Sequence, residues 1–163
     1  MTAAGTLILV ATPIGNLGDF SPRAAEKLAA AELIACEDTR VTRKLLRLTG
    51  TNTEARMVPY HDHNGTEMRP WIISQLEKGR SVVLVSDAGT PLVSDPGYKL
   101  VAACRKQGIP VQSVPGPSAV LAALAVSGLP SNHFMFAGFL ASAGGARRTQ
   151  IAELSDLRAT TIW

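Results

Sequence analysis

Three loops rich in glycine and proline each follow an apolar run and carry polar side chains that could take part in chemistry. They are residues 12–19, 86–97 and 115–119. Glycine lets a backbone approach a ligand closely, and proline fixes its path. None of the loops contains G-x-G-x-x-G or the lysine of a phosphate-binding loop, so each alone could be an ordinary tight turn. If the three apolar runs are strands of one sheet, the three loops lie on the same edge of it. We therefore favour a shared ligand site over three ordinary turns.

Carboxylates stand directly after two of the apolar runs. Glu37 follows residues 32–36 and Asp87 follows residues 81–85. A carboxylate in this position could remove a proton from a weak nucleophile such as a hydroxyl. Further candidates for this role are Asp19, Asp38 and His61. We rank Glu37 and Asp87 first as catalytic residues, because each ends a strong predicted strand, whereas Asp38 is explained as a helix N-cap.

Four basic residues recur at the i, i+3, i+4 and i+7 positions of the helix predicted from residue 38 or 39 to Gly50. They are Arg40, Arg43, Lys44 and Arg47. Three apolar residues, Val41, Leu45 and Leu48, lie on another face of the same helix. A solvated surface is the usual meaning of such a stripe. The alternative is that it contacts the phosphates of a nucleic acid, with an affinity that salt weakens.

The segment 60–64 carries two histidines in alternation, His61 and His63. A pair of neutral histidines can bind a metal ion, but no third or fourth ligand is placed nearby, so we predict no metal site. The side chains are then either surface residues or, together with Tyr60 and Asn64, the wall of a substrate pocket.

The length and composition of the chain are typical of a folded domain. The chain has 163 residues, 46% of them apolar, and a formal charge of +3, which permits an anionic partner without requiring one. Two cysteines, Cys36 and Cys104, stand in apolar surroundings and suggest buried thiols in a reducing compartment. No apolar run is long enough to cross a membrane. We therefore expect a soluble, cytoplasmic protein without a membrane partner.

Apolar runs alternate with helical patterns along the first part of the chain. Strands are predicted at residues 6–11, 32–36, 56–60, 81–85 and 111–114. Helices are predicted at 23–31, 38–50, 71–78, 98–107 and 118–126, where Pro70 either begins the third or kinks a longer one from Thr66. The alternation predicts an α/β fold with a mostly parallel sheet flanked by helices. Such sheets bind ligands beyond the carboxyl ends of their strands.

The last part of the chain breaks this alternation. Residues 134–139 predict a strand, 147–157 a helix and 160–163 the start of another strand. We expect an N-terminal domain at 1–130, and at 131–163 the start of a second α/β domain whose remainder is absent.

The loop 86–97 has two parts with different expected roles. Residues 87–91 are expected to face a ligand. Ser94 or Asp95 is expected to cap the next helix, with Pro96 in its first turn.

Five motifs in order and register carry a resemblance to a known family. They lie at residues 10–19, 35–40, 60–64, 86–97 and 115–119, the last followed by Gly128-Leu-Pro130. The chain resembles the bacterial 16S ribosomal RNA cytidine 2′-O-ribose methyltransferases, within the tetrapyrrole methylase-like superfamily. The resemblance implies two α/β domains with S-adenosylmethionine between them in a homodimer. It also implies a cytidine of 16S ribosomal RNA in the small ribosomal subunit as substrate.

The resemblance also implies cofactor-binding residues. Ile14 and Gly15 align with a cofactor-contacting turn, and Ser118 with Ala119 aligns with a Thr-Ala pair of the superfamily. Gly89, Thr90 and Pro91 fall on its Gly-Asp-Pro turn, where Thr90 replaces the acid of the porphyrin-modifying relatives. Cofactor contacts from the second domain are expected beyond Trp163.

Two other functions remain open from the sequence. One is C-methylation of a tetrapyrrole, such as uroporphyrinogen or a precorrin, by the same fold and cofactor. The segments 37–40 and 60–64 and the basic stripe argue against it. The other is a non-catalytic fragment that binds the cofactor or RNA.

Overall fold

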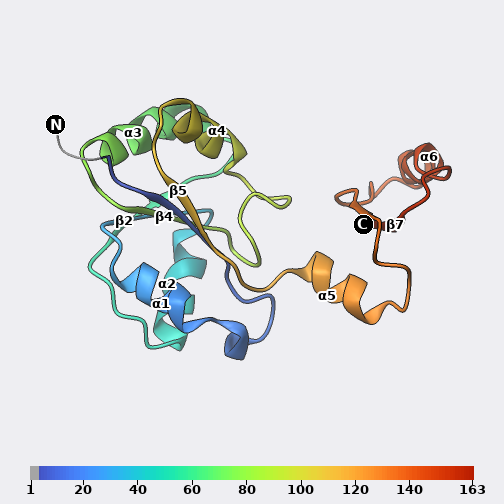
Figure 1. The fold of residues 1–163 in the computed structure, drawn as a ribbon, viewed down its shortest axis with the longest axis horizontal. Coiled ribbons are helices and arrows are strands. Elements are labelled where there is room, and N and C mark those ends of the chain that lie inside the picture. Colours follow the sequence, from blue (N-terminus) through green and yellow to red (C-terminus); the bar gives the residue numbers. More distant parts are fainter. Residues whose placement is uncertain (1–3) are drawn as a thin grey trace. The chain divides into compact units, whose positions relative to one another are not determined.

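A five-stranded parallel sheet forms the centre of the first part of the chain (Figure 1). The computed structural model describes residues 4–163. The chain divides into two compact units, Met1–Pro117 and Ser118–Trp163. In the first unit the strands are β1 (Leu7–Val10), β2 (Leu33–Cys36), β3 (Arg56–Pro59), β4 (Val82–Val85) and β5 (Val111–Val114). Their order across the sheet is β3-β2-β4-β1-β5, and every neighbouring pair is parallel. The predicted α/β fold with a mostly parallel sheet is confirmed.

Helices cover both faces of this sheet. They are α1 (Pro22–Ala29), α2 (Thr39–Leu48), α3 (Gly65–Glu77) and α4 (Tyr98–Lys106), with a short 3-10 helix, η1, at Leu17–Asp19. The period of two along each strand divides the core, because successive side chains point to opposite faces. Leu7 and Leu84 pack with α3 and α4, whereas Ile8 and Val83 pack with α1 and α2. Figure 1 shows the two helix pairs on opposite sides of the sheet.

The connections at β4 leave the sheet in a different direction from those of its neighbours. The chain passes from β4 to α4 on one face, whereas β1 and β2, which flank β4, lead to α1 and α2 on the other. Loops that diverge in this way open a crevice at the carboxyl ends of the strands, where ligands bind in such folds. The loop after β4 therefore lies at the centre of the expected ligand-binding edge.

The beginnings of α1 and α2 follow the predicted capping residues. The Ser21 hydroxyl accepts a hydrogen bond from the Ala24 amide at 3.1 Å, and Pro22 is the first helical residue. Asp38 caps α2 by accepting from the Arg40 amide at 2.8 Å. Pro70 lies inside α3, so the longer of the two predicted helices is correct. Both cysteines are buried and unpaired, as expected.

The predicted cap of α4 is wrong. The N-cap residue is Gly97, without a side-chain hydrogen bond, and neither Ser94 nor Asp95 takes this role. Gly97 has a φ of 133°, and a Cβ there would lie 2.8 Å from Leu84 Cδ2. Because the chain must pass this close to β4, the backbone stays irregular up to Gly97, with positive φ also at Leu92 and Ser94.

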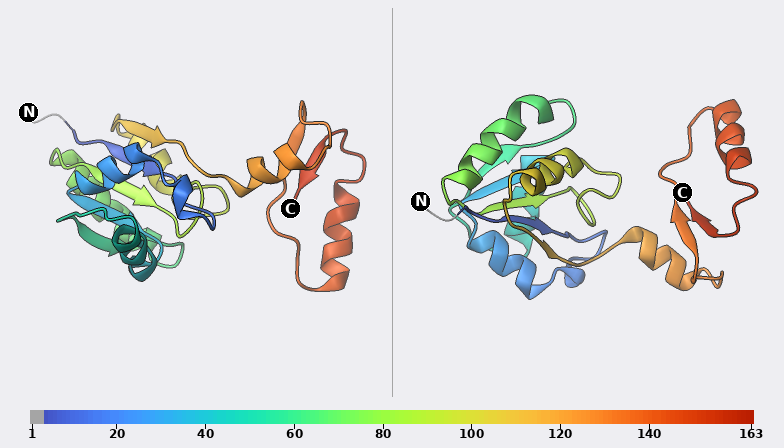
Figure 2. Two further views of the ribbon diagram at one scale, coloured as in Figure 1. Left: turned by 90° about the horizontal axis from the view of Figure 1, so that it is seen from below. Right: turned by 45° about the horizontal axis from the view of Figure 1, so that its top comes forward.

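The second unit contains two helices and a two-stranded parallel sheet. The helices are α5 (Ala119–Val126) and α6 (Gly144–Glu153), and the strands are β6 (Phe134–Phe136) and β7 (Thr160–Ile162). Figure 2 shows these elements in two further views. The compact units separate at Pro117, whereas the sequence predicts domain limits at 1–130 and 131–163. Where the second domain begins stays a prediction.

Two predicted boundaries in the second unit are wrong. The strand predicted to reach residue 139 ends at Phe136, and Gly138 follows with a φ of 83°. The helix predicted at 147–157 lies at Gly144–Glu153. Its first turn accommodates Gly144 and Gly145, and past its end the Ser155 hydroxyl donates to the Ala152 carbonyl at 2.8 Å. None of the helices in residues 4–163 is both long and apolar enough to cross a membrane.

The Gly97 position leads to a test of the fold. We expect Gly97→Ala to destabilise the protein by about 3 kcal/mol, because it combines a disfavoured φ with a steric clash. Gly50→Ala is the matched control, because Gly50 has a positive φ of 64° but open space around its Cβ position. That control should cost about 1 kcal/mol. Urea unfolding followed by circular dichroism measures both, and equal losses would contradict the steric argument.

Candidate active site

Hydrogen bonds join the three glycine-proline loops at the carboxyl ends of β1, β4 and β5. Thr12 and Gly89 exchange two backbone hydrogen bonds, of 2.9 and 3.0 Å. The buried Thr12 hydroxyl also donates to the Ser86 carbonyl at 3.3 Å. The Thr90 hydroxyl donates to the Pro117 carbonyl at 3.2 Å. The loops therefore form one surface, and Thr12, which sequence reasoning did not single out, is its central polar side chain.

The residues predicted to bind a cofactor differ in their exposure. Ile14 and Gly15 are exposed, and Gly15 has open space around its Cβ position. Gly89 is buried, and its Cβ position lies at an ordinary contact distance of 3.5 Å from Ile14 Cγ2, so its φ of 82° is what favours glycine there. Thr90 is half-buried and Pro91 is buried.

The other two predicted cofactor residues begin the second unit. Ser118 is the N-cap of α5, and its hydroxyl accepts from the Leu121 amide at 3.4 Å. Ala119 is the first residue of that helix and is exposed. They are the first two residues after Pro117 in the chain, and their predicted role stays a prediction.

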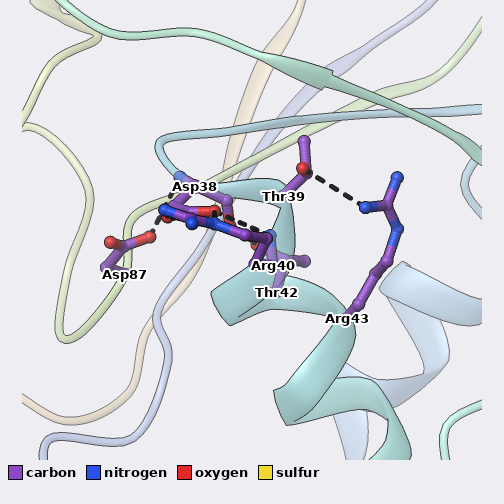
Figure 3. A network of polar contacts seen from close by, with 6 residues as sticks. All are labelled: Asp38, Thr39, Arg40, Thr42, Arg43 and Asp87. Atoms are coloured by element: carbon purple, nitrogen blue, oxygen red, sulfur yellow. Dashed lines mark hydrogen bonds and ion pairs between the residues drawn. The ribbon is translucent and has the colours of Figure 1, made fainter.

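The two carboxylates ranked first lie at the carboxyl ends of neighbouring strands, β2 and β4. Asp87 Oδ1 accepts a hydrogen bond from the Asp38 amide at 3.1 Å, which ties the loop after β4 to the start of α2 (Figure 3). Burial raises the pKa of Glu37, and the negative charge of Asp87 adds to that effect. Burial also raises the pKa of Asp87, despite the amide donor. Both groups are thus stronger bases than a solvated carboxylate.

A third acid, Asp95, belongs to this cluster and was assigned to a helix cap by the sequence. Burial raises the pKa of Asp95, and the charge of Asp87 acts in the same direction. The charge of Asp95 in turn raises the pKa of Glu37. The doubled Ser-Asp of residues 86–87 and 94–95 was the available signal, because one loop returns both acids to the same edge.

Asp38 behaves differently from these three acids. Arg40 Nη2 lies 2.6 Å from Asp38 Oδ2, and Arg40 Nε donates to both carboxylate oxygens at 3.1 Å (Figure 3). These contacts hold the pKa of Asp38 at about 2. Such an acid is a poor proton acceptor at neutral pH, so Asp38 serves as a cap and as the partner of Arg40.

The predicted basic stripe lies on the exposed surface of α2. Its members are Arg40, Arg43, Lys44 and Arg47, all exposed. Arg40 is engaged by Asp38, and Arg43 Nη1 donates to the Thr39 hydroxyl at 3.4 Å (Figure 3). The buried residues of α2 are Thr42 and Leu46.

The apolar face of α2 does not enter the core. Val41 and Leu48 are exposed, and with Leu45 they line a shallow cavity of about 210 Å³ against the loop after β1. Leu17 lines the same cavity, and the polar groups in its wall come from Lys44 and Asp87. Apolar surface, a cation and a carboxylate thus meet beside the strand ends.

The segment 60–64 forms a tight turn before α3. Tyr60 is buried, with 2% of its surface exposed. Asn64 Oδ1 accepts from the His61 amide at 2.9 Å, and Asn64 Nδ2 donates to the Pro59 carbonyl at 3.0 Å. His63 is exposed and packs edge-on to His61, with ring centroids 5.9 Å apart. The structure thus gives Tyr60 and Asn64 a role in shaping the turn, and within residues 4–163 no group of acids, histidines or cysteines is placed to hold a metal ion.

The family model of the tetrapyrrole (corrin/porphyrin) methylases matches residues 6–163. A protein from Mesorhizobium japonicum named ribosomal RNA small subunit methyltransferase I is 55% identical over 157 residues, which is 96% of this chain and 53% of that protein. A protein of the same name from Xylella fastidiosa is 52% identical over 163 residues, which is 100% of this chain and 59% of that protein. The chain thus spans little more than half the length of the curated relatives it matches.

Solved structures show the same fold. The uroporphyrin-III-C-methyltransferase of Thermus thermophilus superposes with a TM-score of 0.59 at 26% identity, covering 81% of this chain and 59% of that one. A structure of the Thermus thermophilus uroporphyrin-III C-methyltransferase complexed with S-adenyl homocysteine superposes with a TM-score of 0.55 at 20% identity, covering 81% and 57%. With its parallel sheet, its joined strand-end loops and a family match across nearly the whole sequence, the chain belongs to the tetrapyrrole (corrin/porphyrin) methylase family.

Proposed function

We propose that the protein takes part in methylation of small-subunit ribosomal RNA, by transferring a methyl group from S-adenosylmethionine to the ribose 2′-hydroxyl of a cytidine in 16S RNA. The observation that carries the proposal is the 52% identity, across all 163 residues, to a protein named ribosomal RNA small subunit methyltransferase I. The position of the methylated atom comes from the motif resemblance. The proposal extends to a homodimer that acts on the small ribosomal subunit in the cytoplasm.

The strand-end loops fit S-adenosylmethionine by the chemistry of their donors. The cofactor carries a sulfonium, an adenine and an amino-acid tail but no phosphates, so it needs backbone hydrogen-bonding groups and apolar walls. The exposed Ile14 and the open space over Gly15 offer both kinds of surface. Support also comes from the uroporphyrin methyltransferase structure, which is described as complexed with S-adenyl homocysteine.

The proposed cofactor set is the one that the motif resemblance implies. It consists of Ile14, Gly15, Gly89, Thr90 and Pro91, together with Ser118 and Ala119. Gly89 and Pro91 are buried, so their contribution is to shape the loop and to present its backbone. When bound, the cofactor supplies a sulfonium methyl group with a thioether as a good leaving group.

The carboxylates would act on the nucleophile. A ribose hydroxyl attacks poorly while protonated, and a nearby base that accepts its proton lowers the barrier. Glu37 and Asp87 follow the neighbouring strands β2 and β4, and burial raises the pKa of each, which supports this role. We assign the acceptance of the proton to this pair. The negative charge of Asp95 would help by raising the pKa of Glu37.

The RNA would be held on both sides of this pair. The basic stripe on α2 offers three exposed cations that Asp38 does not engage, Arg43, Lys44 and Arg47. We propose that they contact backbone phosphates. On the other side, the wall formed by Tyr60, His61, His63 and Asn64 would border the target nucleotide.

A direct measurement tests the proposal. Tritiated methyl transfer from S-adenosylmethionine to isolated small ribosomal subunits should label the RNA, and uroporphyrinogen should receive no label. Label in uroporphyrinogen alone would instead favour C-methylation, the activity named for the 26% identical Thermus thermophilus structure. Cofactor binding with label in neither acceptor would favour a non-catalytic binding role for this chain.

The two carboxylates lead to a paired prediction on activity and stability. Glu37→Gln and Asp87→Asn should each lower the rate of methyl transfer about 100-fold, as expected for loss of a general base. Their folded pKa values are raised, so the ionised groups oppose folding above the ordinary pKa values of 4.5 and 3.8. The amide variants should therefore melt at a higher temperature than the unmodified protein at pH 8, and the difference should shrink toward pH 4.

Single-turnover methyl transfer and thermal melts at the two pH values measure these effects. Glu26→Gln is the control, because Glu26 is an exposed acid on α1 away from the strand ends. It should change neither quantity. Full turnover with normal cofactor affinity in both carboxylate variants would remove Glu37 and Asp87 from the mechanism.

The basic stripe leads to a prediction about salt. Alanine at Arg43, Lys44 and Arg47 together should weaken RNA binding and reduce the slope of log affinity against log salt by about 2, at roughly 0.7 per phosphate contact. The control replaces three exposed cations on other elements, Arg23, Lys78 and Lys106, and so removes the same charge. Filter binding between 50 and 200 mM salt, the range over which such contacts show, measures the slope. Equal slopes for both triple variants would mean that the stripe is only a solvated surface.

A further inference from the structure

A second cavity, of about 180 Å³, lies at the beginnings of α3 and α4. It lies entirely within the first unit. Three of its lining side chains can carry positive charge, His61, Arg69 and Lys99, against one acid, Asp62. Gly65 and Thr66 line it from the start of α3, and Gly97 lines it from the cap of α4. The cavity therefore gathers hydrogen-bond donors around one small volume.

Arg69 is the clearest sign that this cavity suits an anion. Its Nε atom is buried and has no hydrogen-bond partner. In residues 4–163 no acid forms an ion pair with its guanidinium. A buried donor without a partner costs about 1–3 kcal/mol, and more when the group is charged. An anion in the cavity would not reach Nε, which is closed to solvent, but it would balance the charge of the guanidinium.

Gly65 keeps the space next to Arg69 open. A Cβ at residue 65 would lie 3.7 Å from the Tyr60 hydroxyl oxygen and 3.9 Å from Arg69 Nη2. These are ordinary contact distances, so a side chain could be built here without a clash. Such a side chain would occupy the space beside the Arg69 guanidinium. Glycine leaves that space free for a ligand.

Both helices that begin at the cavity lack a side-chain cap. Asn64, the N-cap residue of α3, makes no capping hydrogen bond, because its side chain is used by the His61 amide and the Pro59 carbonyl. Gly97, the N-cap residue of α4, has no side chain to offer. The first amides of a helix have no acceptor within it, and an anion can supply one. Two such helix starts lining one cavity with Arg69 favour a ligand with several acceptor oxygens.

His61 adds a further donor. Its Nδ1 accepts a hydrogen bond from the Asn64 amide at 3.3 Å. The neutral ring then carries its proton on Nε2, which leaves that N–H available to a ligand. Lys99, which is exposed on the first turn of α4, completes the set.

We propose that this cavity binds a phosphate group of the RNA backbone next to the ribose that is methylated. The proposal rests on the proposed function for the identity of the ligand. His61 lines the cavity, and it lies just past β3 as Glu37 lies just past the neighbouring strand β2, where the Tyr60 amide donates to the Cys36 carbonyl at 2.8 Å. In RNA the 2′-hydroxyl and the 3′-phosphate occupy adjacent carbons of one ribose. A phosphate held by Arg69 and Lys99 would thus place the hydroxyl toward the carboxylates.

Titration of the full chain with inorganic phosphate tests the cavity without any methyl transfer. In proton–nitrogen correlation spectra the amide signals of Gly65, Thr66, Tyr98 and Lys99 should shift together with one dissociation constant. Arg69→Met and Lys99→Met should each weaken that binding about tenfold, the usual effect of losing one charge-assisted contact. Lys106→Met is the matched control, because it removes the same charge from the exposed end of α4 and should have no effect. No shift at the four amides would overturn the proposal, and since Lys99 is exposed, its variant keeps the test valid should Arg69→Met unfold the protein.

A second arm separates an RNA phosphate from a free phosphate. A single-stranded oligoribonucleotide should bind Arg69→Met and Lys99→Met more weakly than the unmodified protein, with the salt slope reduced by about 0.7 in each. Phosphate binding that the variants lose while RNA affinity stays unchanged would identify a site for free phosphate or a mononucleotide and would overturn the proposal. A protein that binds RNA through this cavity but transfers no methyl group would contradict only the proposed function.

Discussion

The pair of backbone hydrogen bonds between Thr12 and Gly89 is the contact on which the candidate site depends. β1 and β4 are neighbours whose chains leave the sheet toward opposite faces, so their loops would otherwise separate. The antiparallel bridge holds them together at the point of divergence, and the Thr90–Pro117 hydrogen bond adds the loop after β5. Glycine is favoured at residue 89 because its φ is positive, at 82°. A rigid edge made of backbone groups follows from these few contacts.

Charge is arranged around this edge in two opposite ways. Arg40 neutralises Asp38 and keeps its pKa near 2, so that acid stabilises the start of α2. Within residues 4–163 no cation forms an ion pair with Glu37, Asp87 or Asp95, and burial raises the pKa of each. Holding three partly buried acids together costs stability, and proteins accept this cost mainly where the acids are used. The cavity lined by Arg69 and Lys99 supplies the positive charge that an anionic substrate would need.

Sequence patterns predicted the elements of the first unit well. Helices cover both faces of its sheet, so its central strands are buried and stand out in the sequence as continuous apolar runs. The continuous apolar runs became β1, β2 and β4, and the capping residues Ser21 and Asp38 begin α1 and α2. Prediction failed where packing overrode local preference. The close approach of Gly97 to Leu84 displaced the expected cap of α4. In the second unit the weak signals at 134–139 and 147–157 misplaced both element ends.

The sequence by itself determined the α/β class, the family motifs and the acids that follow β2 and β4, because each depends on the order of residues along the chain. Only the tertiary structure decided which of these residues meet. The sheet order β3-β2-β4-β1-β5 makes β2 and β4 neighbours although 45 residues lie between Cys36 and Val82 in the chain, and so brings Glu37, Asp87 and Asp95 together. It also brought the starts of α3 and α4 to one cavity and left Arg69 Nε without a partner there. Burial and through-space charge depend on the packing of distant segments, and no local pattern contains them.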